Sequence, residues 1–261
     1  MKNNMTKRVA SALGRFMFVA AVAVCLAGCG KETMVAGGFS VGGGRQVKFA
    51  KGNVYYDLLF HKFGIYNSQT EFAGGYNQLI TDTSYHGSVD LFGWGTADNP
   101  TLISQKDEDY ATFTDWGGKV GGNWRTLTKD EWRYIMKERP DAKKKYAYAR
   151  VDNRTGVVLL PDRWTLPDSC VFFPGMSYID SNDYDARMWK KMEDAGAIFL
   201  PSASYRVGTE ITSFTGRYWT ATEDFTNGAW GFAFSGNGKA GVVSYNHRYY
   251  GFAVRLVEDV K

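Results

Sequence analysis

Two glycine-rich motifs carry residues that could do chemistry. Residues 38–42 (Gly-Phe-Ser-Val-Gly) match G-x-S-x-G, a pattern that places a nucleophilic serine on a sharp turn between a strand and a helix. Residues 236–241 (Gly-Asn-Gly-Lys-Ala-Gly) match G-x-G-x-x-G, which binds a dinucleotide where a strand meets a helix N-terminus. No helical pattern follows either motif. We therefore interpret the first as part of a spacer and the second as a β-turn, and we predict neither a catalytic residue nor a cofactor.

The side chains that could bind a metal or act as acid and base are scattered. His61, His86 and His247 have none of the spacings of a zinc site. Acidic residues at 107–109 and 180–185 lack the spacing of a calcium loop, and we interpret them as solvated turns. A glycosidase would need two carboxylates at a set separation in space, which a sequence does not give. The sequence thus predicts no metal site and leaves a carboxylate-based enzyme as an alternative.

The first 28 residues have the composition of an export signal. An apolar run at 16–28, too short to cross a bilayer comfortably, follows four cations: Lys2, Lys7, Arg8 and Arg15. The run ends in Leu-Ala-Gly-Cys at 26–29, which resembles the bacterial lipobox, where a signal peptidase cuts before the cysteine and the thiol carries lipid. We predict removal of residues 1–28, a lipid anchor on Cys29, a flexible spacer at 29–38, and a location at the outer membrane or cell surface.

Charge and cysteine usage restrict the class of partner. The net charge of the whole chain is +4, and the four cations of the leader account for all of it. A neutral mature chain has no long-range field for nucleic acid, so we predict no nucleic-acid partner. Removal of the leader and lipidation of Cys29 leave Cys170 as the only thiol, which excludes an intramolecular disulfide. We predict that Cys170 is buried.

The elements that must position any site are short strands and two helices. The chain is 44% apolar and 16% aromatic, with 30 glycines against 6 prolines, which favours a turn-rich α+β domain packed on aromatic side chains. Thr128 and Glu131 form a capping-box pattern that predicts a helix ending before Pro140. A second helix is expected from Asp185 to Ala195. The expected strands lie at 47–49, 53–56, 198–200, 218–222, 229–235, 241–245 and 252–257.

The strand at 229–235 alternates between large aromatic and small residues. Trp230, Phe232 and Phe234 share one face, which we expect to fill the core. The opposite face should meet solvent. We predict that this face and the segment after it bind a ligand through Gly231, Ala233, Ser235, Asn237, Ser244, Tyr245, Asn246, His247, Tyr249 and Tyr250.

Residues 125–132 (Arg-Thr-Leu-Thr-Lys-Asp-Glu-Trp) resemble the R-L-P-T-x-x-E-W signature of bacterial C-type-lectin-fold domains. The chain resembles surface lipoproteins of the major-paralogous-domain type, and five further landmarks follow the same order: residues 90–96, 159–164, 195–201, 218–223 and 248–257. The resemblance implies a C-type-lectin-like domain over 39–261, with two helices around twisted antiparallel sheets and long loops. It also implies a likeness to the variable proteins of diversity-generating retroelements, in which adenine replacement changes exposed residues near the C-terminus. Adenine replacement in an asparagine codon can produce every residue type found among the predicted ligand-binding residues.

Two departures from the resemblance limit the function. The calcium-dependent sugar motifs E-P-N, Q-P-D and W-N-D are absent, so the fold does not by itself imply sugar binding. The formylglycine-generating relatives work through cysteine chemistry, and Cys170 cannot act as a pair. We therefore expect a non-enzymatic, adhesin-like protein that binds a protein or glycan on another surface. The alternatives are an enzyme on the same scaffold, either modifying-factor-like or a carbohydrate hydrolase, and a structural envelope or fimbrial subunit.

Overall fold

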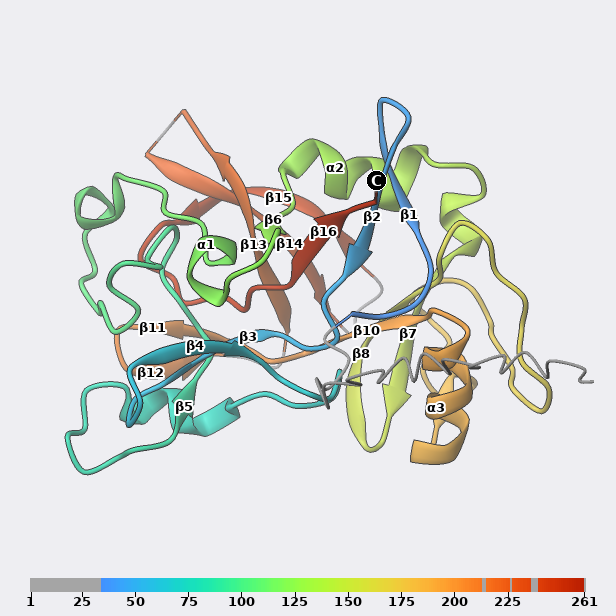
Figure 1. The fold of residues 1–261 in the computed structure, drawn as a ribbon, viewed down its shortest axis with the longest axis horizontal. Coiled ribbons are helices and arrows are strands. Elements are labelled where there is room, and N and C mark those ends of the chain that lie inside the picture. The colour runs from blue at the N-terminus through green and yellow to red at the C-terminus, as the bar shows by residue number, and fades with distance from the viewer. Residues whose placement is uncertain (1–33, 213–214, 226, 236–238, 261) are drawn as a thin grey trace, which may run out of the picture. The chain divides into compact units, whose positions relative to one another are not determined.

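The structure is a computed structural model, and it describes residues 34–260 except 213–214, 226 and 236–238. The side chains of residues 239 and 243–245 also lie outside the described part. The described residues belong to one unit, Lys31–Lys261. They form a mixed α+β fold, in which most elements are strands of several antiparallel sheets and the helices are few (Figure 1).

The helices are short and lie between strands in the chain. The α-helices are α1 (Gly117–Val120), α2 (Lys129–Arg133) and α3 (Ala186–Asp194), and shorter turns are η1 (Gly74–Leu79), η2 (Asp107–Tyr110), η3 (Tyr134–Glu138) and η4 (Ala142–Lys144). The strands are β1 (Phe39–Gly42), β2 (Arg45–Phe49), β3 (Val54–Asp57), β4 (Lys62–Ile65), β5 (Ser88–Val89), β6 (Arg125–Thr126), β7 (Tyr146–Val151), β8 (Arg154–Leu159), β9 (Asp183–Tyr184), β10 (Ile198–Pro201), β11 (Tyr205–Val207), β12 (Glu210–Thr212), β13 (Gly216–Glu223), β14 (Gly228–Ser235), β15 (Lys239–His247) and β16 (Leu256–Asp259).

In the described residues, the strands form five sheets. Their strand orders are β1-β2-β16-β6, β4-β3-β5, β10-β8-β7-β9, β11-β12 and β13-β14-β15. All pairs within them are antiparallel except the two-residue pair of β7 with β9. The last strand, β16, pairs with β2 near the start of the described chain, with Val257 opposite Phe49. The two ends of the described chain therefore share one sheet (Figure 1).

The start of α2 confirms the predicted capping box. Thr128 Oγ1 accepts a hydrogen bond from Glu131 N at 3.3 Å, and the Glu131 carboxylate accepts one from Thr128 N at 2.9 Å. The helix continues through the wider turn η3 and ends at Arg139, before Pro140. Trp132, on α2, is buried and stacks on Phe232 of β14 with ring centroids 4.4 Å apart. The helix is therefore fixed against one face of the β13-β14-β15 sheet (Figure 1).

The second predicted helix is α3, and its local signals are also confirmed. The Asp185 side chain accepts a hydrogen bond from Met188 N at 2.7 Å, and Gly196 adopts a φ of +99° just after the helix. Trp189 and Met192 are buried. The four-residue helix α1 was not predicted, because Gly-Gly-Lys-Val lacks both an N-cap side chain and a helical apolar pattern.

The residues of the 125–132 signature hold elements together. Arg125 bonds both oxygens of Glu131, with Nη1 and Nη2 at 2.8 and 2.9 Å, and it also binds both oxygens of Asp259 at the end of β16. Arg45 adds a further contact to Glu131 at 3.1 Å. Glu131 is itself buried. The signature thus ties the start of α2 to the chain's last strand, which is a structural and not a catalytic role.

Three clusters of buried side chains form the core. One surrounds Trp132 and Phe232, a second contains Trp219 stacked on Phe252 with centroids 4.1 Å apart, and a third lies under α3 around Trp189. Cys170 belongs to the third cluster and is 7% exposed, so its predicted burial is confirmed. In the described part of the chain, no helix is long and apolar enough to cross a membrane.

Two sequence-based boundaries are wrong. The strand predicted at 252–257 is not continuous, because Phe252 and Ala253 pair with Phe92 and Tyr218, whereas β16 begins at Leu256 and pairs with a different sheet. The spacer predicted at 29–38 is already packed where it can be described: Met34 pairs with Ala50 and Val35 is 3% exposed. Burial of Val35 against the core draws this segment into the fold.

Candidate ligand-binding face

The β13-β14-β15 sheet presents two different faces. Cross-strand pairs place Tyr218 opposite Phe232 and Arg217 opposite Ala233, so these two pairs lie on opposite sides of the sheet. Phe232 and Phe234 are buried on the α2 side, at 0% and 2% exposed. Their predicted inward orientation is confirmed. The other face carries Arg217, Ala233 and Ser235, and we call it the ligand-binding face.

The alternation of β14 continues to its start, but the face opposite Phe232 is covered there. Gly231 pairs with the buried Trp219 and is itself buried. The expectation that Gly231 faces solvent is wrong, because a Cβ there would lie 3.2 Å from the Phe252 ring. Trp230 packs against Lys129 of α2, with Nζ 4.5 Å from its ring centroid, so it lies on the α2 side as predicted but is only half-buried.

A pocket of about 560 Å³ lies along the end of this sheet. Ala233 and Ser235, both predicted to face outward, are half-buried and line it together with Arg217. The remaining lining residues come from β14, β15 and neighbouring segments: Lys137, Tyr146, Met176, Thr215, Phe234, Ala240, Gly241 and Val242. Small side chains on the strands leave this space open.

Arg217 connects the pocket to a group of aromatic side chains. Its guanidinium carbon lies 4.9 Å from the Tyr205 ring centroid and 5.5 Å from that of Phe252. Nη1 donates to Asn246 Oδ1 at 3.1 Å, while Nε is buried without a hydrogen-bond partner. Ring contacts of this kind are worth about 0.5–2 kcal/mol and hold the guanidinium in one orientation.

Asn246 was predicted to contact ligand, and the structure gives it another role. Its side chain is 4% exposed and bonds both the Arg217 guanidinium and, through Nδ2 at 3.3 Å, the carbonyl of Ala229. We correct its assignment to a residue that positions Arg217. Asn246 pairs with Ala229, next to the register shift between β14 and β15.

Tyr205, His247, Tyr249 and Tyr250 form what we call the aromatic cluster. The His247 ring stacks on Tyr249 at 4.7 Å and meets Tyr250 edge-on at 5.3 Å, and Tyr250 contacts Tyr205 at 5.5 Å. All four side chains are half-buried, so each keeps one side accessible. Partial burial raises the pKa of Tyr250, which keeps its hydroxyl protonated at neutral pH.

Asp107 fixes the cluster from a distant part of the chain. His247 Nδ1 donates to one Asp107 oxygen at 2.8 Å, and Arg248 N donates to the other at 2.6 Å. Arg248 is 7% exposed, with its guanidinium 4.7 Å from the centroid of the Trp94 ring. The acidic stretch at 107–109 is therefore partly a support for this face and not simply a solvated turn.

Three predicted ligand-binding residues cannot be assessed. Asn237 lies outside the described residues. Ser244 and Tyr245 belong to β15, but their side chains are outside the described part. Of the predicted set, the structure brings together Ala233 and Ser235 at the pocket, and His247, Tyr249 and Tyr250 in the aromatic cluster. Arg217, Tyr205 and Lys137 join them although no motif marked these residues.

In the described part of the chain, the two glycine motifs lie next to strands, without the strand-to-helix turn that each pattern requires. Ser40 lies on strand β1, and its hydroxyl donates to Asp162 at 2.6 Å, a carboxylate that also pairs with Arg139. Hydrogen bonds from Ser40 and Gln46 outweigh the opposing effect of burial and hold the pKa of Asp162 below its usual range. The second motif spans the β14–β15 connection, so it joins two strands and not a strand to a helix.

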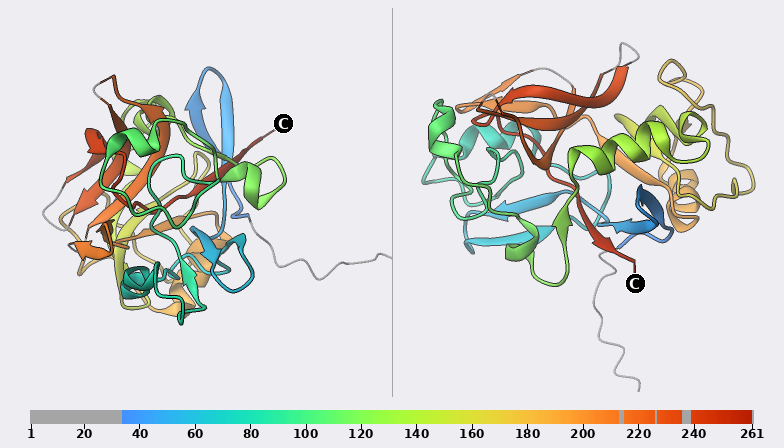
Figure 2. Two further views of the ribbon diagram at one scale, coloured as in Figure 1. Left: turned by 90° about the vertical axis from the view of Figure 1, so that its left-hand side faces the viewer. Right: turned by 90° about the horizontal axis from the view of Figure 1, so that it is seen from above.

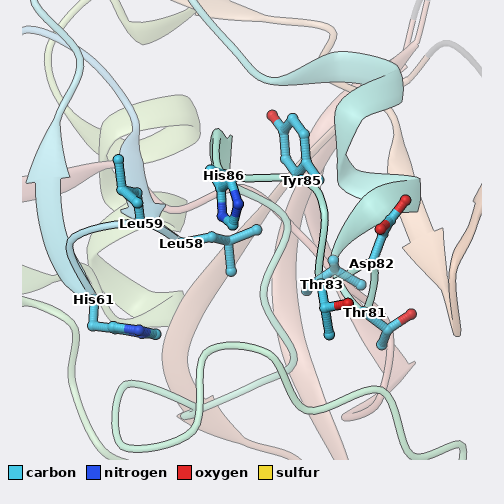
Figure 3. A pocket seen from close by; sticks show the side chains of 9 residues that line it. Leu58, Leu59, His61, Thr81, Asp82, Thr83, Tyr85 and His86 are labelled. Carbon is cyan, nitrogen blue, oxygen red and sulfur yellow. The ribbon is translucent and has the colours of Figure 1, made fainter.

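A further pocket, of about 380 Å³, contains two of the three histidines (Figure 3). His61 and Asp82 lie at opposite sides of it, with His86 between Leu58 and Tyr85. Among the residues that the structure describes, no group of three His, Cys, Asp or Glu side chains could hold a metal ion.

The buried carboxylates of the described chain are Asp90 and Glu131. Asp90 accepts hydrogen bonds from Asn77 Nδ2 and Ala73 N, both at 2.8 Å, whereas Glu131 is bound by Arg125. Among the described residues they share no hydrogen-bond partner.

Comparisons of the chain with protein-family models, with curated proteins and with solved structures give no match. The functional argument is therefore carried by the geometry of the chain itself. That geometry offers one extended surface, running from the aromatic cluster through Arg217 to the pocket.

Proposed function

We propose that the protein is a lipid-anchored cell-surface protein that binds a protein or glycan ligand through the ligand-binding face and the aromatic cluster. The observation that carries this proposal is the continuity of the surface. The aromatic cluster contacts Arg217 through the Tyr205 ring, and Arg217 lines the pocket. Tyrosine and arginine are the side chains most enriched at binding hot spots, because they offer large contact area at low entropic cost.

The same proposal assigns a C-type-lectin-like fold to the described domain. Its support is the arrangement of the signature residues: Arg125 and Glu131 join α2 to the last strand, and Trp132 fixes α2 against the sheet whose other face is displayed. A rigid support beneath a face with small residues is the property that a diversified surface needs. We include diversification of this face by a retroelement in the proposal.

Attachment to the outer membrane or cell surface through Cys29 completes the proposal. Cys29 lies outside the described residues, five positions before Met34, which pairs with Ala50. Five extended residues span at most about 18 Å, so a lipid at Cys29 would hold the domain close to the bilayer. Two or more acyl chains would make that attachment stable, whereas a single chain would be marginal.

The test is loss of binding without loss of fold. The full-length protein, purified in detergent, is applied to whole bacterial and host cells and to a glycan array. The double change Tyr249→Ala and Tyr250→Ala is expected to weaken binding at least about tenfold, because truncation of a hot-spot aromatic typically costs more than 1 kcal/mol.

Exposed tyrosines elsewhere give a matched control. Tyr76 and Tyr178 are 61% and 50% exposed and lie outside the aromatic cluster, so their replacement by alanine should leave binding unchanged. Thermal unfolding of each variant separates lost binding from lost structure. Binding retained by the Tyr249/Tyr250 variant would contradict the proposal, as would equal loss in the control.

A further inference from the structure

The pocket beside Arg217 has an unbalanced charge. Two of its eleven lining residues, Arg217 and Lys137, are cations, and none is an acid. Among the residues that the structure describes, neither cation lies within ion-pair distance of a carboxylate. Within the described part of the chain, Arg217 donates to the neutral amide of Asn246 and to no acid. The pocket therefore carries positive charge that the described residues do not neutralise.

The described arginines balance their charge in different ways. Six of them contact at least one acid: Arg45, Arg125, Arg133, Arg139, Arg150 and Arg248. Arg206 and Arg255 are buried and donate to backbone carbonyls, and Arg154, Arg163 and Arg187 are exposed. Arg217 is only partly exposed and lines a pocket, and within the described residues its buried Nε has no hydrogen-bond partner.

Arg217 is also held in place before any ligand arrives. The rings of Tyr205 and Phe252 lie 4.9 and 5.5 Å from its guanidinium carbon, and Asn246 holds Nη1. A planar guanidinium fixed in this way offers its remaining donors as a fork that matches an anionic oxygen pair. Less side-chain freedom is lost on binding than for a mobile surface cation.

We propose that this pocket binds the anionic group of an acidic saccharide, a sugar ring that bears a carboxylate or a sulfate. The inference rests on the proposed function and names its ligand class. Arg217 and Lys137 contact the anion. Tyr146, on the wall, bears a hydroxyl that can bond a ring hydroxyl of the sugar.

The walls favour a saccharide over an acidic peptide. Apolar atoms of Met176, Phe234 and Val242 face the same space as the hydroxyl-bearing Tyr146 side chain, which suits the two-sided character of a sugar ring. The volume of about 560 Å³ is that of an ordinary small-ligand pocket. The adjoining Tyr205 and Tyr250 rings offer further surface on which the next sugar of a chain can pack.

The test uses the full-length protein in detergent and calorimetric titration with four probes. These are a galacturonate tetrasaccharide, a sulfated galactose tetrasaccharide, an uncharged galactose tetrasaccharide and a glutamate hexapeptide. We expect one of the two acidic saccharides to bind more tightly than the uncharged one, and the stronger of the two identifies carboxylate or sulfate as the anion. The advantage should shrink with added salt.

Charge-neutral variants assign the effect to the pocket. Arg217→Gln is expected to weaken binding of the preferred acidic saccharide by about tenfold to a hundredfold, since a charge-assisted hydrogen bond is lost. Lys137 is exposed, so Lys137→Gln should keep the fold, and it should weaken binding less than Arg217→Gln. Arg187→Gln and Lys143→Gln, also exposed but outside the pocket, are the matched controls. Neither control should change the affinity.

Four outcomes would overturn the inference. They are equal affinity for charged and uncharged saccharides, preference for the glutamate peptide, equal losses in the control variants, and unchanged affinity in both Arg217→Gln and Lys137→Gln. The proposed function and this inference can be told apart. The array could detect an uncharged ligand whose binding is lost in the Tyr249/Tyr250 variant and kept in Arg217→Gln. In that case the proposed function stands and this inference is wrong.

Discussion

The buried carboxyl of Asp90 makes a quantitative prediction about pH and stability. Asp90 is 0% exposed, and burial is the main cause that raises its pKa from 3.8 to about 6, opposed by hydrogen bonds from Asn77 and Ala73. Below about pH 3 the carboxyl is protonated in both the folded and unfolded chain. Between about pH 4 and pH 6 only the unfolded chain releases the proton, so this group lowers stability as pH rises.

The size of the effect follows from the two pKa values. A pKa raised from 3.8 to about 6 corresponds to about 3 kcal/mol of stability lost by pH 7. Asp90→Asn removes the titration. The free energy of unfolding of Asp90→Asn minus that of the parent protein should therefore rise by about 2.4 kcal/mol from pH 4 to pH 7, since about 0.6 kcal/mol is already lost at pH 4. Because the other titrating groups are the same in both proteins, they cancel in this difference.

The assay is urea unfolding of both proteins at half-unit steps of pH from 4 to 8. The asparagine amide will meet an N–H donor from Asn77 or Ala73 and cost about 1–3 kcal/mol, but this offset does not depend on pH. Asp259→Asn is the control of opposite sign, since the hydrogen bond from Arg125 lowers the Asp259 pKa. A pH-independent Asp90 difference would refute the reasoning. A difference that falls with pH would show that hydrogen bonding outweighs burial.

Three further predictions concern the scaffold and the anchor. Thr128→Ala should lower the free energy of unfolding by about 1 kcal/mol in denaturant titration through loss of the α2 cap, and no change would argue against the capping box. Trp132→Ala should cost about 3–5 kcal/mol because it removes the ring stacked on Phe232, whereas Trp132→Phe should cost less; equal costs would contradict the stacking argument. Cys29→Ser should move the protein from the membrane pellet to the supernatant and abolish incorporation of labelled palmitate, and an unchanged pellet fraction would exclude the lipid anchor.

Local signals predicted the helices well. Thr128 and Asp185 cap α2 and α3 as their sequences indicate, because a capping side chain contacts a backbone N–H only three residues away. Such contacts depend on nothing outside the helix. The short helix α1 has no cap and was missed; a Cβ at Gly117 would lie 2.0 Å from Trp124 O, so close packing between segments and not local preference places it.

Strand alternation predicted only part of the candidate site. Phe232 and Phe234 are inward as expected, whereas Gly231 is covered on the opposite face by Phe252, which comes from a later segment of the chain. Asn246 is buried, and it bonds Arg217 and the carbonyl of Ala229. These contacts depend on tertiary packing, so the β14 sequence alone does not indicate them.

Arg217 was missed although a signal existed. It is the residue before Tyr218 on a strand whose aromatic residues point inward, so alternation places it on the outward face. Trp219 obscured this pattern. It is also aromatic, but it lies on the same face as Arg217, opposite to Tyr218, where it packs on Phe252. Lys137 and Tyr205 reach the site through tertiary packing alone, and no sequence spacing could have joined them to it.

Hydrogen–deuterium exchange of the full-length protein, with and without a saturating glycan identified on the array, tests the central claim most directly. The account predicts slower exchange in peptides that cover Arg217, the end of β14 and residues 246–250, with no change around Arg154 and Phe72, which border a separate pocket of about 540 Å³. Protection at Arg154 and Phe72, with the C-terminal face unchanged, would contradict the claim that this face binds the ligand.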